Sequence, residues 1–181
     1  MDVKPFGRLR LFALYADFAA AVRARRIVSR ITQLAGEEWK AGSEMWKLEC
    51  LRASPAIRTM MTREAADADV LIAAISSLDR REDELVAWLD AVAAVSGRRA
   101  SPGLFIGLLG DEDGRAAELD WTVKQFLRCA RQMDRDFIWH WMEPPILDDD
   151  EWLATSVETL MGRKMSARDA AFPPEPILAT I

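Results

Sequence analysis

The sequence predicts an α/β protein with an open, three-layer, doubly wound five-stranded parallel sheet of strand order 2-1-3-4-5. Two segments carry this prediction, because each is a short run that is apolar on both faces: 69–77 (DVLIAAISS) and 103–109 (GLFIGLL). Strands covered on both sides have this pattern, which is typical of the middle of a parallel sheet. Patterns of helical period surround each run, so strands and helices alternate, which favours right-handed crossovers between parallel strands.

The first strand is predicted over Arg8–Tyr15, where an alternating start leads into a fully apolar end. Asp17 follows and is a suitable N-cap for a helix that ends near Leu34, before the stop signal Gly36. The inward stripe of this helix is expected at Phe18, Val22, Ile27, Ile31 and Leu34.

The second strand is predicted over Glu44–Cys50, where charged and apolar residues alternate as in an edge strand with one covered face. Ser54-Pro55 begins the next helix, with serine as the cap and proline in the first turn, and this helix ends near Ala66. Its Met60 and Met61 are interpreted as core residues and not as metal ligands.

The third helix follows the central strand and reaches Gly97, the fourth is predicted over about Arg115–Met133, and the fifth strand over Asp136–Met142. Residues 1–142 therefore form the predicted α/β domain. Residues 143–181 form a C-terminal extension, with a short helix from about Asp149 to Met161 and an irregular proline-rich end. This end either lies on the domain or is free.

The 181 residues suffice for one domain with a sizeable core, and 50% hydrophobic with 29% charged residues is ordinary for a globular protein. No apolar run approaches the ~20 residues that span a bilayer, and the N-terminus has no signal-peptide core. We therefore expect a cytoplasmic protein without membrane contact. The net charge of −5 gives no reason to bind nucleic acid, although Arg23, Arg25, Arg26 and Arg30 form a basic stripe, for which a solvated helix face is the alternative.

Cys50, Cys129 and His140 are the chain's only cysteines and its only histidine, and their spacing matches no metal site. Buried, reduced thiols are the default for such a chain. A catalytic Cys/His pair requires proximity in space, which the sequence does not indicate.

In this fold, ligands bind outside the carboxyl ends of the strands, near the switch point between strands one and three. The sequence places six candidate ligand-binding residues there: Tyr15, Asp17, Ser76, Ser77, Asp79 and Asp111. The carboxylates among them, together with Glu112 and Asp113, are of the type that holds Mg²⁺ with several waters, and solvated loop charge is the alternative.

The strand pattern over Arg8–Met142 resembles, in topology, the receiver domain of response regulators and, more broadly, flavodoxin-like proteins. Receivers need an acidic pair after strand one, a phosphorylatable aspartate at the end of strand three, a Thr/Ser after strand four and a lysine after strand five. In this chain Asp17 is a single acid, Ser76-Ser77 stands where the aspartate would be, and Asp79 is a displaced alternative. The resemblance therefore implies a degenerate receiver that is not phosphorylated in the usual way.

Flavodoxins bind the phosphate of FMN in a Ser/Thr/Gly-rich loop after strand one. The corresponding segment here, Tyr15-Ala16-Asp17-Phe18, has no glycine and carries an anion that repels phosphate. Neither a G-x-G-x-x-G motif nor a P-loop occurs in the sequence. We therefore expect no bound cofactor.

Residues 68–73, followed by Glu84 near the start of a helix, are similar to an arrangement in deoxyribosyltransferases, which use a helix-borne glutamate as nucleophile. A helix N-terminus stabilises a carboxylate anion, so this resemblance implies Glu84 as a nucleophile. The alternative is that Glu82, Asp83 and Glu84 only complement the helix dipole.

Aromatic residues gather on the fifth strand, in a chain with seven tryptophans. Trp139 and Trp141 share one face with Phe137, and His140 lies on the other. An edge this aromatic is expected to be covered, either by the fourth helix and the C-terminal segment or by an oligomer interface that includes Trp121.

These observations favour a non-catalytic regulatory or protein-interaction module that resembles a degenerate receiver and binds a protein partner or a second copy of itself. The alternative is an enzyme that acts on a nucleotide or sugar-like ligand at the carboxyl edge of the sheet, with Asp17 and Glu84 as its catalytic candidates.

Overall fold

All strands of the sheet are parallel and follow the order β2-β1-β3-β4-β5, which confirms the predicted flavodoxin-like topology. The computed structural model describes residues 7–75, 82–96, 103–110, 116–141 and 151–171. The strands are β1 (Gly7–Tyr15), β2 (Trp39–Lys47), β3 (Val70–Ile75), β4 (Gly103–Leu109) and β5 (Arg135–Trp141). The helices are α1 (Phe18–Ala35), the 3₁₀ helix η1 (Leu48–Arg52), α2 (Pro55–Asp67), α3 (Glu82–Ser96), α4 (Ala116–Gln132) and α5 (Glu151–Ala171).

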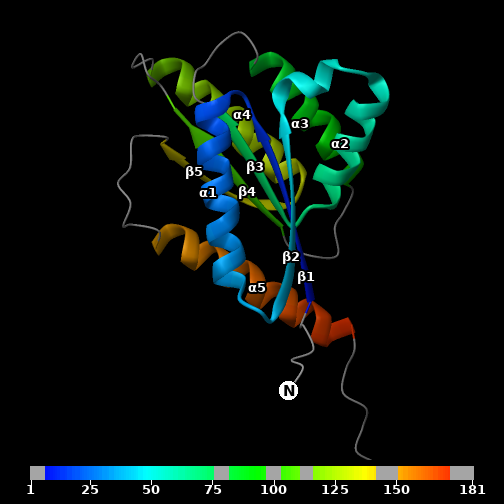
Figure 1. The fold of residues 1–181 in the computed structure, drawn as a ribbon, viewed down its shortest axis with the longest axis vertical. Helices are drawn as coiled ribbons and strands as arrows, with labels where there is room; N and C mark the ends of the chain where they lie inside the picture. The colour runs from blue at the N-terminus through cyan, green and yellow to red at the C-terminus, as the bar shows by residue number, and fades with distance from the viewer. Residues whose placement is uncertain (1–6, 76–81, 97–102, 111–115, 142–150, 172–181) are drawn as a thin grey trace, which may run out of the picture.

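Helices cover both faces of the sheet and form three layers with it (Figure 1). The helices α2, α3 and α4 lie on one face, while α1 and α5 lie on the other. Every residue of β3 and β4 is buried, as expected for the two strands that are apolar on both faces.

Local capping explains where two of the helices begin. The Asp17 carboxylate accepts a hydrogen bond from the backbone N–H of Ala20, and the Ser54 hydroxyl accepts one from Ile57, so both predicted N-caps are confirmed. Gly36 ends α1 with a φ of 66°, a conformation that favours glycine.

The predicted position of β2 is wrong. The strand covers Trp39–Lys47 because this segment pairs with β1 from Gly7 opposite Trp39 to Tyr15 opposite Lys47. Leu48 and Cys50, predicted to end the strand, belong to η1 instead. Leu48 and Leu51 are buried, and a spacing of three residues places both on one side of a 3₁₀ helix.

The predicted inward stripe of α1 is also wrong at its start, because Phe18 is 84% exposed and Val22 is exposed too. The buried residues of α1 are Ala20, Ala24, Val28, Ile31 and Ala35, and the two in its first half are alanines. Alanines allow the helix to approach the strands closely. Phe18 and Val22 each precede a buried alanine by two residues, which places them on the opposite side of the helix, facing solvent.

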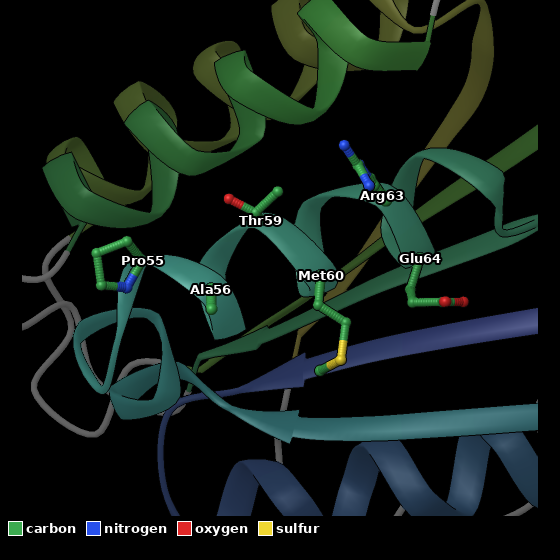
Figure 2. Close-up of a pocket in the computed structure, with 6 residues that line it drawn as sticks. All are labelled: Pro55, Ala56, Thr59, Met60, Arg63 and Glu64. Atoms are coloured by element: carbon green, nitrogen blue, oxygen red, sulfur yellow. The ribbon is translucent and has the colours of Figure 1, made fainter.

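The two methionines of α2 have different environments, so the prediction that both are core residues is half wrong. Met61 is fully buried, whereas Met60 is exposed. Figure 2 shows Ala56, Met60 and Glu64 pointing toward β1 and β2, with Thr59 and Arg63 on the other side of the helix. Together with Pro55 they line a shallow depression of about 560 Å³.

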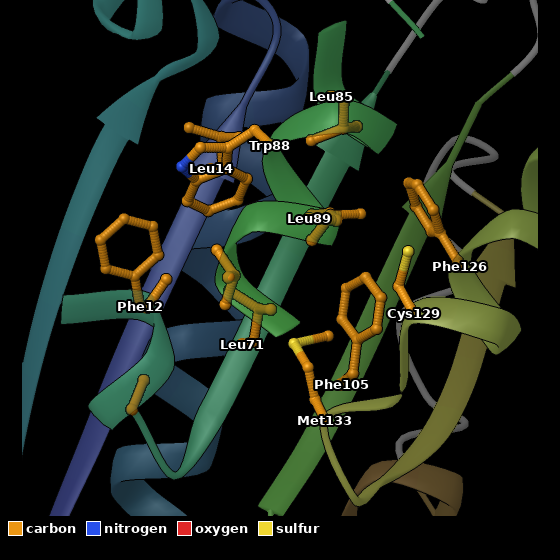
Figure 3. Packing of buried hydrophobic residues seen from close by; sticks show 14 of the residues in the cluster. Phe12, Leu14, Leu71, Leu85, Trp88, Leu89, Phe105, Phe126, Cys129 and Met133 are labelled. Atoms are coloured by element: carbon orange, nitrogen blue, oxygen red, sulfur yellow. The ribbon is translucent and has the colours of Figure 1, made fainter. Parts of the chain in front are cut away.

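The core between the sheet and the helices α2–α4 is rich in aromatic side chains (Figure 3). Trp88 stacks on Phe12 with a centroid distance of 5.9 Å, and Phe105 packs against Phe126 at 5.3 Å. A second core on the opposite face includes Leu153, Val157 and Leu160 of α5.

Helix α5 covers Glu151–Ala171, so the predicted end near Met161 is wrong and the helix ends ten residues later, at Ala171. Its last turns lie at the amino ends of the strands, where Lys164 Nζ is 2.6 Å from Asp69 Oδ1 and 3.3 Å from the Arg8 carbonyl oxygen. Sequence periodicity missed this extension because charge pairing, and not an apolar stripe, holds the second half of the helix. None of the helices in the described ranges has the length and apolar character that crossing a membrane requires.

Candidate functional site

The carboxyl edge of the sheet brings the ends of β1 and β3 to the N-terminus of α1. The backbone N–H of Ala16 donates to the Ala74 carbonyl at 3.0 Å, which fixes the segment between β1 and α1 against β3. Asp17 then turns the chain into α1, and its Oδ1 is 2.9 Å from Ala20 N. Tyr15 is partly buried against the α1/α5 side of the sheet. The site predicted at the switch point therefore contains a helix terminus whose N–H already has a carboxylate partner.

Glu84 is engaged by Arg52, which comes from η1 after β2. Arg52 Nε is 2.9 and 2.7 Å from the two carboxylate oxygens of Glu84, and Arg52 Nη2 is 2.6 Å from one of them. The hydrogen bonds and charge of Glu84 raise the pKa of the Arg52 guanidinium, so Arg52 keeps its positive charge beside this carboxylate. Arg52 and Glu84 are 32 positions apart, so this pairing has no local signal in the sequence.

A carboxylate held by an arginine fork is a poorer nucleophile than a free one, because attack requires loss of both hydrogen bonds. The ion pair of Glu84 with Arg52 therefore connects α3 to η1, which is a structural role. The two catalytic candidates have different partners in the structure, since Asp17 caps α1 while Glu84 accepts hydrogen bonds from Arg52.

Four of the predicted ligand-binding residues lie outside the described residues: Ser76, Ser77, Asp79 and Asp111. The same is true of Glu112 and Asp113, which were considered as Mg²⁺ ligands. Among the residues that the structure does describe, no group of three or more His, Cys, Asp or Glu side chains is arranged to hold a metal ion.

The predicted aromatic interface lies at the β5 edge of the sheet. Trp121 in α4 and Trp139 in β5 are 41% and 40% exposed, and the side chain of Trp141 is outside the described part of the chain. Phe137 packs into the core beside Phe105 and Phe126. On the opposite face His140 stacks on Trp152 of α5, with centroids 5.1 Å apart. Helix α5 thus contacts one face of this edge, and Trp121 and Trp139 are partly open to solvent.

Cys129 lies in the core between α3 and α4. Its Sγ is 3.6 Å from Asp90 Oδ1, and Arg128 pairs with the same carboxylate at 2.8 Å. Burial raises the pKa of the Cys129 thiol to about 12, and the neighbouring Asp90 adds to this rise. The hydrogen bond from Arg128 lowers the pKa of Asp90, so Asp90 stays an anion beside the thiol.

We expect Cys129 to be inert in the folded protein, because a thiol with a pKa of about 12 is a thiolate in roughly one molecule in ten thousand at pH 8. Titration with a chromogenic disulfide reagent at that pH should label Cys50 alone, since Cys50 is only partly buried. Two thiols should react after unfolding in guanidinium. A Cys50→Ser variant that still reacts rapidly in native buffer would contradict this expectation.

Comparison with solved structures supports the fold assignment. A short-chain flavodoxin associated with a PDU bacterial microcompartment matches with a TM-score of 0.51 and 13% identity, over 85% of this chain and 97% of that one. A flavodoxin of Streptococcus pneumoniae TIGR4 matches with a TM-score of 0.52 and 15% identity, over 84% and 98% of the two chains. An oxidoreductase of Corynebacterium diphtheriae gives 0.53 and 11%, over 88% and 96%.

These structures share with this protein a five-stranded flavodoxin-like fold, and at such identities the likeness concerns the fold alone. No protein-family model matches the sequence. No curated protein matches it either.

Proposed function

We propose that this protein is a non-catalytic interaction module on a flavodoxin-like fold, which resembles a receiver domain without its phosphorylation residues and binds a protein partner in place of a flavin. The observation that carries the proposal is the 2.9 Å hydrogen bond from the Ala20 N–H to the Asp17 carboxylate. In flavodoxin-like folds FMN lies at the β1/β3 switch point, and phosphate binds N–H groups at a helix N-terminus. Here a carboxylate of the chain itself uses such an N–H group and repels a second anion.

The surface beside this helix terminus supports protein binding. Phe18 and Val22 are exposed one turn apart on α1, and Arg25 and Arg26 are exposed one turn further on. Helix α1 contains four arginines and no acidic residue, although the whole chain has a net charge of −5. Aromatic residues and arginine are enriched at protein interfaces. A partner with an acidic surface would complement this face.

The enzyme hypothesis requires a free carboxylate at the same edge. Glu84 accepts hydrogen bonds from Arg52, and Asp17 accepts one from Ala20. Both residues thus have structural tasks that account for their positions. A non-catalytic function explains these contacts with fewer assumptions.

Flavin binding tests the proposal directly. We expect FMN, nucleotides and inorganic phosphate to leave the melting temperature unchanged, since only a ligand that prefers the folded state raises it. An Asp17→Ser variant keeps a capping side chain and removes the charge, so it is the matched control. Phosphate affinity that appears only in this variant would show that the Asp17 anion excludes phosphate. Micromolar binding of FMN by the wild-type protein would overturn the proposal.

The binding surface is tested by comparing two variants of equal stability as bait in a co-purification experiment. A Phe18→Ser/Val22→Ser variant should lose a partner that the wild-type protein retains, whereas Trp121→Ser/Trp139→Ser should keep it. The reverse result would move the interface to the β5 edge. Retention of the partner by both variants would exclude both surfaces.

A further inference from the structure

The outer side of β2 is an exposed sheet edge. β2 pairs with β1 on one side, and in the part of the chain that the structure describes no strand pairs with its other side (Figure 1). From Gly42 to Glu44 the strand is exposed. An exposed edge presents unpaired N–H and C=O groups that are a template for another strand.

We propose that a second copy of this chain pairs with this edge, so that two β2 strands run antiparallel about a two-fold axis at Gly42. In this register Lys40 lies opposite the partner's Glu44, and Glu44 lies opposite the partner's Lys40. Trp39 lies opposite the partner's Met45 by the same operation. The strand is therefore complementary to itself in charge and in apolar character, as a two-fold interface requires.

The backbone allows this pairing. Alternate residues of β2 direct their N–H and C=O groups toward β1, and the others direct them outward. Antiparallel pairing about Gly42 places even-numbered residues opposite even-numbered ones and odd-numbered residues opposite odd-numbered ones. Outward-directed groups therefore meet outward-directed groups along the whole ladder, and the two sheets become one continuous sheet.

Charge selects this axis among its neighbours. An axis at Ser43 also satisfies the backbone, but it places Lys40 opposite the partner's Trp46 and forms no pair of opposite charges. An axis at Glu44 places two carboxylates opposite each other. Like charges directly opposite on a sheet are destabilising, and opposite charges are stabilising. Charges on an edge strand commonly serve to prevent association with other strands. That protective role does not require a lysine and a glutamate at equal distances on either side of Gly42, as Lys40 and Glu44 are.

The monomer also contains an unfavourable pair that the partner would relieve. Arg8 of β1 lies directly beside Lys40 in the parallel ladder, and both side chains are exposed. No ion pair of Lys40 occurs within the described ranges. The partner's Glu44 would add a carboxylate on the other side of Lys40 and offset this repulsion.

There is room for the partner's side chains. A Cβ added to Gly42 would meet no atom within 4 Å. A groove of about 190 Å³ runs beside it, with Arg10, Ser43 and Glu64 among its lining residues. The ladder is short, so we expect a dimer whose population depends on protein concentration. The interface involves none of the residues at the N-terminus of α1, so it does not depend on the function proposed above.

Sedimentation velocity over a wide concentration range, with reciprocal charge variants, tests the dimer. Lys40→Glu and Glu44→Lys should each raise the dimer dissociation constant by roughly tenfold or more, because two symmetric pairs change from attraction to repulsion. The double variant should restore the wild-type constant. An equimolar mixture of the two single variants should form a heterodimer, since every cross-strand pair is then of opposite sign.

Lys124→Glu is the matched control for Lys40→Glu, because it makes the same change in net charge on α4, away from the β2 edge. It should leave the dissociation constant unchanged. A protein that stays monomeric at the highest concentration would overturn the proposal. So would a dimer that ignores both single changes, or a double variant that remains as weak as either single one.

Discussion

Replacing Trp88 with alanine is expected to lower the free energy of unfolding by about 3–5 kcal/mol, the range for removal of a buried aromatic side chain. Trp88 is fully buried and stacks on Phe12. Its indole Nε1 donates to the hydroxyl of the buried Thr62 at 3.1 Å. The substitution removes the largest fully buried side chain among the described residues, together with a buried hydrogen bond.

Chemical denaturation monitored by far-UV circular dichroism measures this loss. Trp88→Phe keeps a ring against Phe12, and the Thr62 hydroxyl keeps its hydrogen bond to the Arg58 carbonyl at 2.7 Å. This variant should therefore lose about 0.5–1.5 kcal/mol for the hydrogen bond from the indole, with a smaller cavity cost than alanine. Trp121→Ala, at an exposed position, should stay within about 0.5 kcal/mol of the wild-type protein. Equal losses for Trp88→Ala and Trp121→Ala would contradict the packing described for this core.

Replacing Lys164 with methionine is expected to cost about 3 kcal/mol or more. The ammonium group lies 2.6 Å from Asp69 Oδ1, and the two side chains are only 14% and 5% exposed. Asp69 Oδ2 accepts a hydrogen bond from the Arg10 backbone N–H at 2.8 Å, and Lys164 Nζ lies 5.9 Å from the Trp39 ring centre. Removing one partner of a buried ion pair is the costly change, because the Asp69 carboxylate then loses the ammonium group that it contacts.

Arg163→Met is the control for this prediction, because the adjacent Arg163 pairs with Asp136 while both side chains are about half exposed. An exposed ion pair contributes at most about 1 kcal/mol, so this variant should be nearly as stable as the wild-type protein. A Lys164→Met/Asp69→Asn double variant should be more stable than the sum of its single losses predicts, since both charges of the pair are then removed together. Similar losses for Lys164→Met and Arg163→Met would refute the role of the buried pair.

The capping residues and the doubly apolar strands are the features that the sequence predicts best, because each depends on neighbours along the chain. Asp17 and Ser54 cap their helices through residues three positions on. The runs that became β3 and β4 are apolar throughout, so only a central position covers them.

The predicted bounds of β2 were wrong for a different reason. Gly42-Ser43 has the composition of a loop, and the alternation beyond it continues through Cys50. Backbone pairing with β1 decides that these residues are extended, and η1 begins where that pairing ends. Pairing depends on a strand more than thirty residues away, which local composition does not encode.

The candidate site shows the same division. Sequence position alone puts Asp17, Arg52 and Glu84 near one edge of the sheet, because the carboxyl ends of parallel strands share that edge. Only the folded chain shows that Asp17 caps its own helix while Arg52 holds Glu84. These side chains therefore form contacts within the protein, so Asp17 and Glu84 are less available to bind or attack a ligand.

Periodicity and contacts within one helical turn were enough to predict the class of fold, the order of its elements and the residues that begin α1 and α2. Only the folded chain shows that Phe18 is exposed, that Lys164 is largely buried against Asp69, and that the edge strand β2 covers Trp39–Lys47. The physical reason is that burial and charge pairing depend on which distant segments pack together, and α5 reaches Asp69 from the far end of the chain.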